Sequence, residues 1–198
     1  MATLTMQSPS IPTLEAEALA QQAALVQRAM SDPQAFTALY ESHFERVYRY
    51  HLARSGSAAE AQDLTTLTFV AALENLERFR GTGSFSAWLF GIARRQAAMY
   101  FRSRKREVEL DAAMTLADTA PLPEILAGQR LEIAQVTAVL EIINPERREA
   151  ILLCLFSQLS VEEAGLVMGK SPNAVKMLLW RGIRDLRELF ASSQETFA

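Results

Sequence analysis

A stretch of cations interleaved with aromatic residues is the feature of this sequence with the most evident chemistry. Eight Arg and Lys residues lie between positions 78 and 106, and no Asp or Glu falls among them. Cations gathered in this way bind nucleic-acid phosphates through the release of counterions. Aromatic rings in the same stretch could stack on unpaired bases, at about 1–3 kcal/mol per base. The large aromatics Phe85, Trp88 and Phe90 are, however, more typical of a core.

A second pattern, from Ser160 to Arg184, is typical of a helix-turn-helix. Ser160 and Glu163 form a capping-box signal at the start of a short helix, and Gly169 marks the turn. Gly165 lies inside the short helix, which predicts a close approach of the second helix. The second helix would turn an apolar face inward, and its outer face suits the major groove with Asn173, Lys176, Met177, Trp180, Arg181 and Arg184.

Helices are the elements that must position both patterns. Periodicity and caps predict helices over about 14–30, 32–53, 58–76, 85–104, 124–143, 145–157, 160–169 and 172–191. Residues 107–124 are acidic and contain Pro121 and Pro123, which is typical of a linker. The sequence therefore predicts an all-α protein of two small helical domains, 14–106 and 125–191, joined by a flexible acidic linker, with tails at 1–13 and 192–198.

Composition excludes several classes of protein. The chain has 198 residues and a net charge of −3, so a globally basic nucleic-acid binder is excluded, although a locally basic one is not. One Cys and two distant His residues supply neither an internal disulfide nor a usual zinc site. The longest apolar run, from Ala150 to Phe156, is too short for membrane insertion, and the cytoplasm is the default location. With no phosphate loop and no nucleophile–base pair, we expect no enzyme activity, no cofactor and no small-molecule substrate.

Three segments of the chain resemble the extracytoplasmic-function (ECF) group of sigma-70 family RNA polymerase sigma factors. The stretch Ala61–Leu73 is similar to the helix of sigma region 2.2, and Pro145–Leu189 is similar to region 4. Residues Phe79–Arg94 carry the pattern FRG, SF, WL and IAR in the order typical of regions 2.3 and 2.4. The two similar parts cover most of the chain.

The resemblance implies a division of labour between the two domains. The first would bind core RNA polymerase at the beta-prime clamp through Asp63, Leu64, Thr66, Leu67 and Phe69. The same domain would open the −10 promoter element through Arg80, Gly81, Ser84, Trp88, Arg94, Arg95, Met99 and Arg102. The second would contact the beta flap and read the −35 element through Arg147, Arg148, Ser171, Asn173, Lys176, Met177, Trp180 and Arg181. The resemblance also implies an anti-sigma factor as a further partner.

A few residues depart from the family pattern, and two other functions stay open. Leu67 stands where the family usually has Gln or an acidic residue, and Met177 and Leu178 make the last helix less polar than usual. Glu149 replaces a commonly basic residue, and it would repel phosphate. The alternatives are a helix-turn-helix regulator that acts without polymerase and a helical protein-interaction adaptor. The base-stacking aromatics argue against the first alternative, whereas the departures favour the second.

Overall fold

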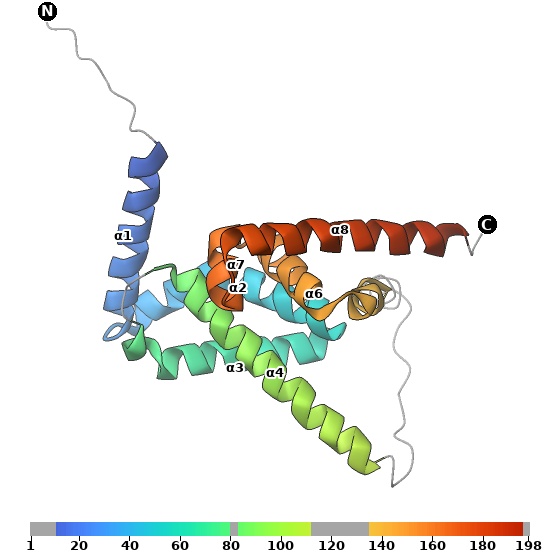
Figure 1. The fold of residues 1–198 in the computed structure, drawn as a ribbon. Helices are drawn as coiled ribbons and strands as arrows, with labels where there is room; N and C mark the ends of the chain where they lie inside the picture. The colour runs from blue at the N-terminus through green and yellow to red at the C-terminus, as the bar shows by residue number, and fades with distance from the viewer. Residues whose placement is uncertain (1–10, 80–82, 112–134, 196–198) are drawn as a thin grey trace, which may run out of the picture.

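The computed structural model describes residues 11–79, 83–111 and 135–195, and every regular element in these ranges is a helix (Figure 1). The N-terminal unit consists of α1 (Ile11–Ala29), α2 (Pro33–Ser55), α3 (Ala58–Glu74), the 3₁₀ turn η1 (Leu76–Arg78) and α4 (Phe85–Asp111). The C-terminal unit consists of a helix over 135–142, α6 (Pro145–Ile151), the π-helical turn η2 (Leu152–Phe156), α7 (Val161–Met168) and α8 (Pro172–Glu195). The all-α prediction is confirmed.

Local signals in the sequence set the ends of several helices. The Asp32 side chain accepts a hydrogen bond from the Gln34 backbone N–H at 2.9 Å, and Pro33 begins α2. Gly56 ends α2 in the left-handed region, at φ 70°. Both halves of the predicted capping box are present at Ser160 and Glu163, and Gly169 ends α7 at φ 66°. These caps confirm the helix boundaries that the sequence indicated.

One core runs through both units. In the N-terminal unit α2, α3 and α4 bury Tyr50, Leu64, Phe85 and Phe90. In the C-terminal unit α6, η2, α7 and α8 bury an apolar set that includes Leu140, Ile151, Leu152, Leu153 and Val175. The C-terminal unit packs on the N-terminal one where η2 meets α2 and α7 meets α4. Figure 1 shows α8 on one side of this assembly and α3 on the opposite side.

Some elements differ from their predicted form. The helix after Pro145 changes to π-helical turns at Leu152, and the Ser157 backbone N–H and hydroxyl both donate to the Leu152 carbonyl. The α4 helix continues past Arg104 to Asp111, because no breaking residue stands there. An added Cβ at Gly165 would lie 2.7 Å from the Lys170 carbonyl oxygen. The close approach at Gly165 therefore comes from the turn before α8 and not from the body of that helix.

Candidate functional site: three helix faces and a joint between the units

One face of α4 carries most of the side chains predicted to contact the −10 element. Trp88, Arg95, Met99 and Arg102 recur at spacings of three, four and seven residues, which places them on one side of the helix. Arg95, Met99 and Arg102 are exposed, whereas Trp88 is half-buried, with its ring centroid 5.5 Å from those of Phe79 and Phe85. The face thus carries one half-buried aromatic ring near its N-terminal end and exposed cations further along the helix. Arg80 and Gly81 lie outside the described residues.

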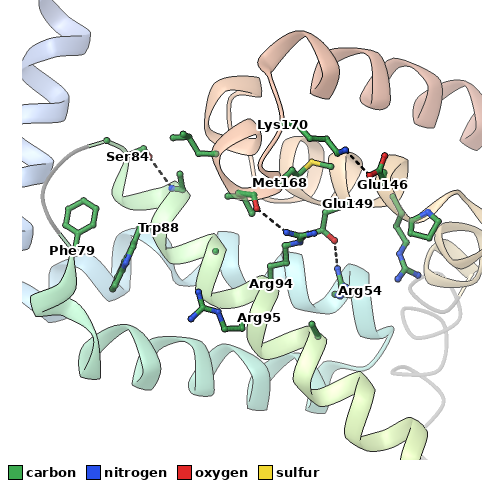
Figure 2. Close-up of a pocket in the computed structure, with 18 of the residues that line it drawn as sticks. Arg54, Phe79, Ser84, Trp88, Arg94, Arg95, Glu146, Glu149, Met168 and Lys170 are labelled. Carbon is green, nitrogen blue, oxygen red and sulfur yellow. Dashed lines mark hydrogen bonds and ion pairs between the residues drawn. The ribbon is translucent and has the colours of Figure 1, made fainter.

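Two other residues predicted for the −10 surface contact the C-terminal unit. Ser84 caps α4 by accepting from the Ala87 backbone N–H, and its hydroxyl donates to the Glu163 carboxylate of α7. Arg94 donates from Nη1 to the Val167 carbonyl oxygen at 3.2 Å, and its Nε lies 3.6 Å from a Glu149 carboxylate oxygen. Figure 2 shows Arg94 reaching toward the C-terminal unit while Arg95 points away from it. These two side chains are therefore engaged within the chain.

A buried carboxylate lies at the centre of this joint. Glu149 of α6 accepts a hydrogen bond from Tyr50 Oη at 2.8 Å and an ion-paired one from Arg54 Nη1 at 2.6 Å. Burial, and then the Glu149 carboxylate, raise the pKa of Tyr50, which therefore stays a hydrogen-bond donor. We call Tyr50, Arg54, Arg94 and Glu149 the Glu149 cluster. From the sequence, Glu149 was expected only to repel phosphate. The structure shows that it pairs with Arg54 and Arg94 of the other unit.

Arg46 makes a second polar connection between the units, which the sequence did not predict. Its Nε donates to the Ser157 carbonyl oxygen at 2.8 Å, and its Nη2 donates to the Gln158 carbonyl oxygen at 3.2 Å. Burial lowers the pKa of Arg46, yet the guanidinium has carbonyl partners that accept its protons. Residues separated by more than a hundred positions leave no local pattern in the sequence, so this contact could not be predicted from spacing.

A cleft of about 930 Å³ opens between α4, α6 and α7, and Figure 2 shows the side chains around it. Cations outnumber carboxylates in its lining, because Glu146 and Glu149 face Arg54, Arg78, Arg94, Arg95, Arg148 and Lys170. Arg148 is half-buried there, and burial together with the nearby Arg54 charge lowers the pKa of Arg148. Of the two arginines predicted for the −35 site on α6, Arg148 thus lines the cleft.

The other arginine, Arg147, pairs with Asp185 of α8 at 2.6 Å and ties the two helices together. The outer face of α8 is open, since Asn173, Lys176, Met177, Trp180 and Arg181 are all exposed. Ser171 is exposed and caps the helix by accepting from the Ala174 backbone N–H. Trp180 is 59% exposed and lies under the Arg184 guanidinium at 5.6 Å. The structure therefore gathers the predicted side chains of α8 on one accessible face.

The five residues of α3 that are predicted to contact polymerase lie partly on the surface and partly in the core. Asp63, Thr66 and Leu67 are exposed, and Leu67 keeps 48% of its surface open. Leu64 and Phe69 are buried, so their part in any contact is to hold the helix in place. Val70 and Leu73 extend the exposed apolar face by two further positions. Leu67, Val70 and Leu73 follow one another at intervals of three residues, and this spacing is the signal by which sequence analysis could have found the last two.

No cluster of His, Cys, Asp and Glu that could hold a metal ion occurs in residues 11–79, 83–111 and 135–195. Within the same ranges, no helix is long and apolar enough to cross a membrane. Cys154 is half-buried, and burial raises the pKa of its thiol to about 11. The chemistry of the described surface is therefore that of exposed cations, aromatic rings and apolar side chains on helices.

Comparisons with known proteins agree with this architecture. The family models for sigma-70 region 2 and sigma-70 region 4 match residues 39–107 and 133–186. The ECF RNA polymerase sigma factor BldN of Streptomyces coelicolor is 36% identical over 169 residues, which cover 83% of this chain and 64% of BldN, less than two thirds of that relative's length. The RNA polymerase sigma factor CnrH of Cupriavidus metallidurans is 31% identical over 180 residues, covering 85% of this chain and 93% of CnrH.

A solved structure of CnrH in complex with the cytosolic domain of CnrY superposes with a TM-score of 0.66 at 26% identity. It covers 86% of this chain and 97% of that chain, so the likeness extends through both units. Sequence and fold lead to the same family. The chain belongs to the ECF group of the sigma-70 family of RNA polymerase sigma factors.

Proposed function

We propose that the chain is a specialised sigma factor that binds core RNA polymerase, recognises −35 and −10 promoter elements and promotes DNA opening. One observation carries the proposal: three separate exposed faces, each on a helix fixed by the core, present the side chains that these three contacts require. The protein then acts by binding and not by catalysis, and it works in the cytoplasm, where it meets polymerase and promoter DNA.

The polymerase contact uses the exposed face of α3. Asp63, Thr66 and Leu67 face the beta-prime clamp in this proposal, and buried Leu64 and Phe69 keep the helix in register. Leu67 is exposed on this face, where the family usually has Gln or an acidic residue, so an acidic side chain at this position is compatible with the proposed contact. The C-terminal unit would contact the beta flap.

The −10 contact uses α4 and the loop before it. Extruding a base from the duplex costs a few kcal/mol of lost stacking and pairing, so an opened strand needs both cations and a stacking surface. Arg95, Met99 and Arg102 are exposed on the face of α4 that also carries the half-buried Trp88, and they follow it along the helix. In the proposal Ser84, Arg94, Arg80 and Gly81 complete this site.

The −35 contact uses the outer face of α8 in the major groove. Lys176 and Arg181 supply donors to bases and phosphates, while Met177 and Trp180 suit thymine methyl groups. Ser171 and Asn173 stand at the N-terminal end of the helix, where DNA phosphates approach. Arg147 supports the site by fixing α8 against α6, and Arg148 lies nearby on α6.

The proposal also assigns the functions to domains and includes a protein that would regulate this chain. We place the polymerase and −10 functions in residues 14–106, the −35 function in 125–191, and a linker in 107–124. The CnrH structure contains the cytosolic domain of CnrY, and the sigma factor RpoE of Bartonella quintana has been solved in complex with the anti-sigma factor NepR. We therefore propose that an anti-sigma factor binds this chain as well.

The test is reconstitution with sigma-free core polymerase and the DNA upstream of the protein's own gene. Gel filtration should show a complex, and permanganate should detect unpaired thymines at the −10 position. Arg95→Ala should reduce opening, and Arg181→Ala should reduce promoter binding and lower its salt dependence by about one phosphate contact. Arg28→Ala makes the same change of charge on α1, at a residue paired with Asp32, and serves as the control.

Absence of a polymerase complex at micromolar concentration would refute the proposal. Duplex binding without polymerase or opening would favour a helix-turn-helix regulator. Loss of all salt-dependent DNA affinity would instead favour a protein-interaction adaptor.

A further inference from the structure

The C-terminal unit covers part of the surface that the proposed function assigns to the −10 element. Ser84 and Arg94 use their polar atoms on Glu163, Val167 and Glu149. Figure 2 shows α7 lying over the side of α4 that carries Arg94. The Arg94 side chain keeps 45% of its surface exposed, but its polar atoms and the Ser84 hydroxyl are already paired, so a DNA strand would have to displace these partners. The arrangement described is therefore closed with respect to the opened strand.

Glu149 is the most deeply buried charged group among the polar contacts between the units. Its side chain is 8% exposed, and a carboxylate removed from water is destabilising unless it is paired and hydrogen-bonded. Its polar partners in the described structure, Tyr50, Arg54 and Arg94, all belong to the N-terminal unit. Arg54 is held in position by the faces of the Tyr50 and Phe101 rings. Removing the carboxylate charge thus acts on the joint between the units.

The closed arrangement leaves the other proposed DNA face open. Trp180 and Met177 keep 59% and 48% of their surfaces exposed, and Lys176 and Arg181 are exposed beside them. None of these four side chains contributes to the Glu149 cluster or to the contacts of Arg46. Separation of the units is therefore needed for one DNA contact and not for the other.

We propose that Glu149 latches the free chain closed, so that binding of single-stranded −10 DNA requires separation of the units whereas binding of duplex −35 DNA does not. The identity of the two DNA contacts rests on the proposed function. The latch itself rests only on the contacts of Glu149. The two can therefore be tested by separate measurements on the same variants.

The experiment compares the free full-length chain with its Glu149→Gln variant. Small-angle X-ray scattering reports the separation of the units, and fluorescence anisotropy reports affinity for DNA from upstream of the protein's own gene, offered as single strand and as duplex. We expect Glu149→Gln to raise the radius of gyration and to strengthen single-strand binding roughly tenfold or more, because one partner of a buried ion pair is lost. Duplex binding should change by less than about twofold, as for an independent site.

Two further variants keep the test decisive. Glu146→Gln changes an exposed carboxylate of the same helix that pairs with Lys170 inside the C-terminal unit, and it should behave as the parent chain. Tyr50→Phe removes a hydrogen bond to Glu149 from the other unit without a change of charge, and it should open the chain in the same direction by a smaller amount. It also replaces Glu149→Gln as the test if circular dichroism shows that the latter is unfolded.

Unchanged scattering and unchanged single-strand affinity in a folded variant would overturn the latch. An expanded chain that binds neither form of DNA would support the latch and refute the DNA contacts. An expanded chain with stronger duplex binding as well would overturn the claim that the −35 face is open in the closed form.

Discussion

Replacing Gly165 by Ala sets helix propensity against a steric contact in the turn of the helix-turn-helix. Gly165 is buried in α7, and the Lys170 backbone N–H donates to its carbonyl oxygen at 2.9 Å. A Cβ at this position would lie 2.7 Å from the Lys170 carbonyl oxygen and 3.7 Å from the Pro172 nitrogen. Both neighbours are backbone atoms of a turn that Gly169 fixes at φ 66°, so neither can rotate away.

The magnitude follows from two opposing terms. Ala is favoured over Gly inside a helix by about 1 kcal/mol. Overpacking of a tight site costs roughly 1–3 kcal/mol, and a backbone neighbour favours the upper part of that range. We therefore expect Gly165→Ala to lower the free energy of unfolding by about 1–2 kcal/mol. For a chain of this size the melting temperature should fall by roughly 2–8 °C.

Gly91 provides the matched control, because it lies inside α4 and a Cβ there would meet no atom within 4 Å. Gly91→Ala should raise the free energy of unfolding by up to about 1 kcal/mol. Urea unfolding followed by circular dichroism measures both variants, and duplex binding reports whether α8 has shifted. If Gly165→Ala stabilises the chain as much as Gly91→Ala does, the steric argument is wrong.

Three more predictions concern single side chains. Burial, and then the Arg54 charge, lower the pKa of His51 to about 3, so below pH 6.5 the unfolded chain binds a proton that the folded chain does not. The free energy of unfolding of the parent chain should therefore fall by about 2 kcal/mol between pH 7 and pH 5 because of His51, and urea unfolding of His51→Gln should lack this part of the fall. Equal losses would contradict this. Because burial raises the pKa of Cys154 to about 11, a chromogenic disulfide reagent should modify it slowly at pH 8 until urea is added; equal rates with and without urea would count against it. Leu67→Glu should leave polymerase affinity unchanged or tighter, since Leu67 is exposed; a marked loss on titration would show that the apolar side chain is itself the contact.

Sequence reasoning succeeded where the determinant is local. The Asp32 and Ser160 caps are set by side chains that bond to backbone N–H groups two or three residues away, so spacing alone predicted them. The exposed face of α8 followed in the same way from helical periodicity, with Val175 buried and Trp180 open. The all-α architecture could be predicted because helix caps and helical periodicity are local features of this kind.

Two kinds of feature were not predicted from the sequence. One is contacts between residues far apart in the chain, and the other is the end of a helix where no Pro or Gly stands. Glu149 meets Tyr50 and Arg54 across about a hundred positions, and nothing in either local pattern indicates the other. The sequence predicted that the helix beginning at Phe85 ends near Arg104, but the Glu and Val residues that follow do not break a helix, and α4 continues to Asp111. A change of charge is thus a weaker boundary signal than a Pro or Gly.

If the three exposed faces act as proposed, their placement implies an order of binding. Figure 1 shows the α3 helix, which carries the exposed Leu67, on the side of the molecule opposite α8, and neither helix contributes a side chain to the Glu149 cluster. Polymerase and duplex DNA can therefore approach the closed chain without breaking any contact between the units. Only the opened strand must compete with Glu149, Glu163 and the Val167 carbonyl for Arg94 and Ser84. Under the proposed function and the proposed latch, the contact that captures melted DNA therefore becomes available last, after the units have separated.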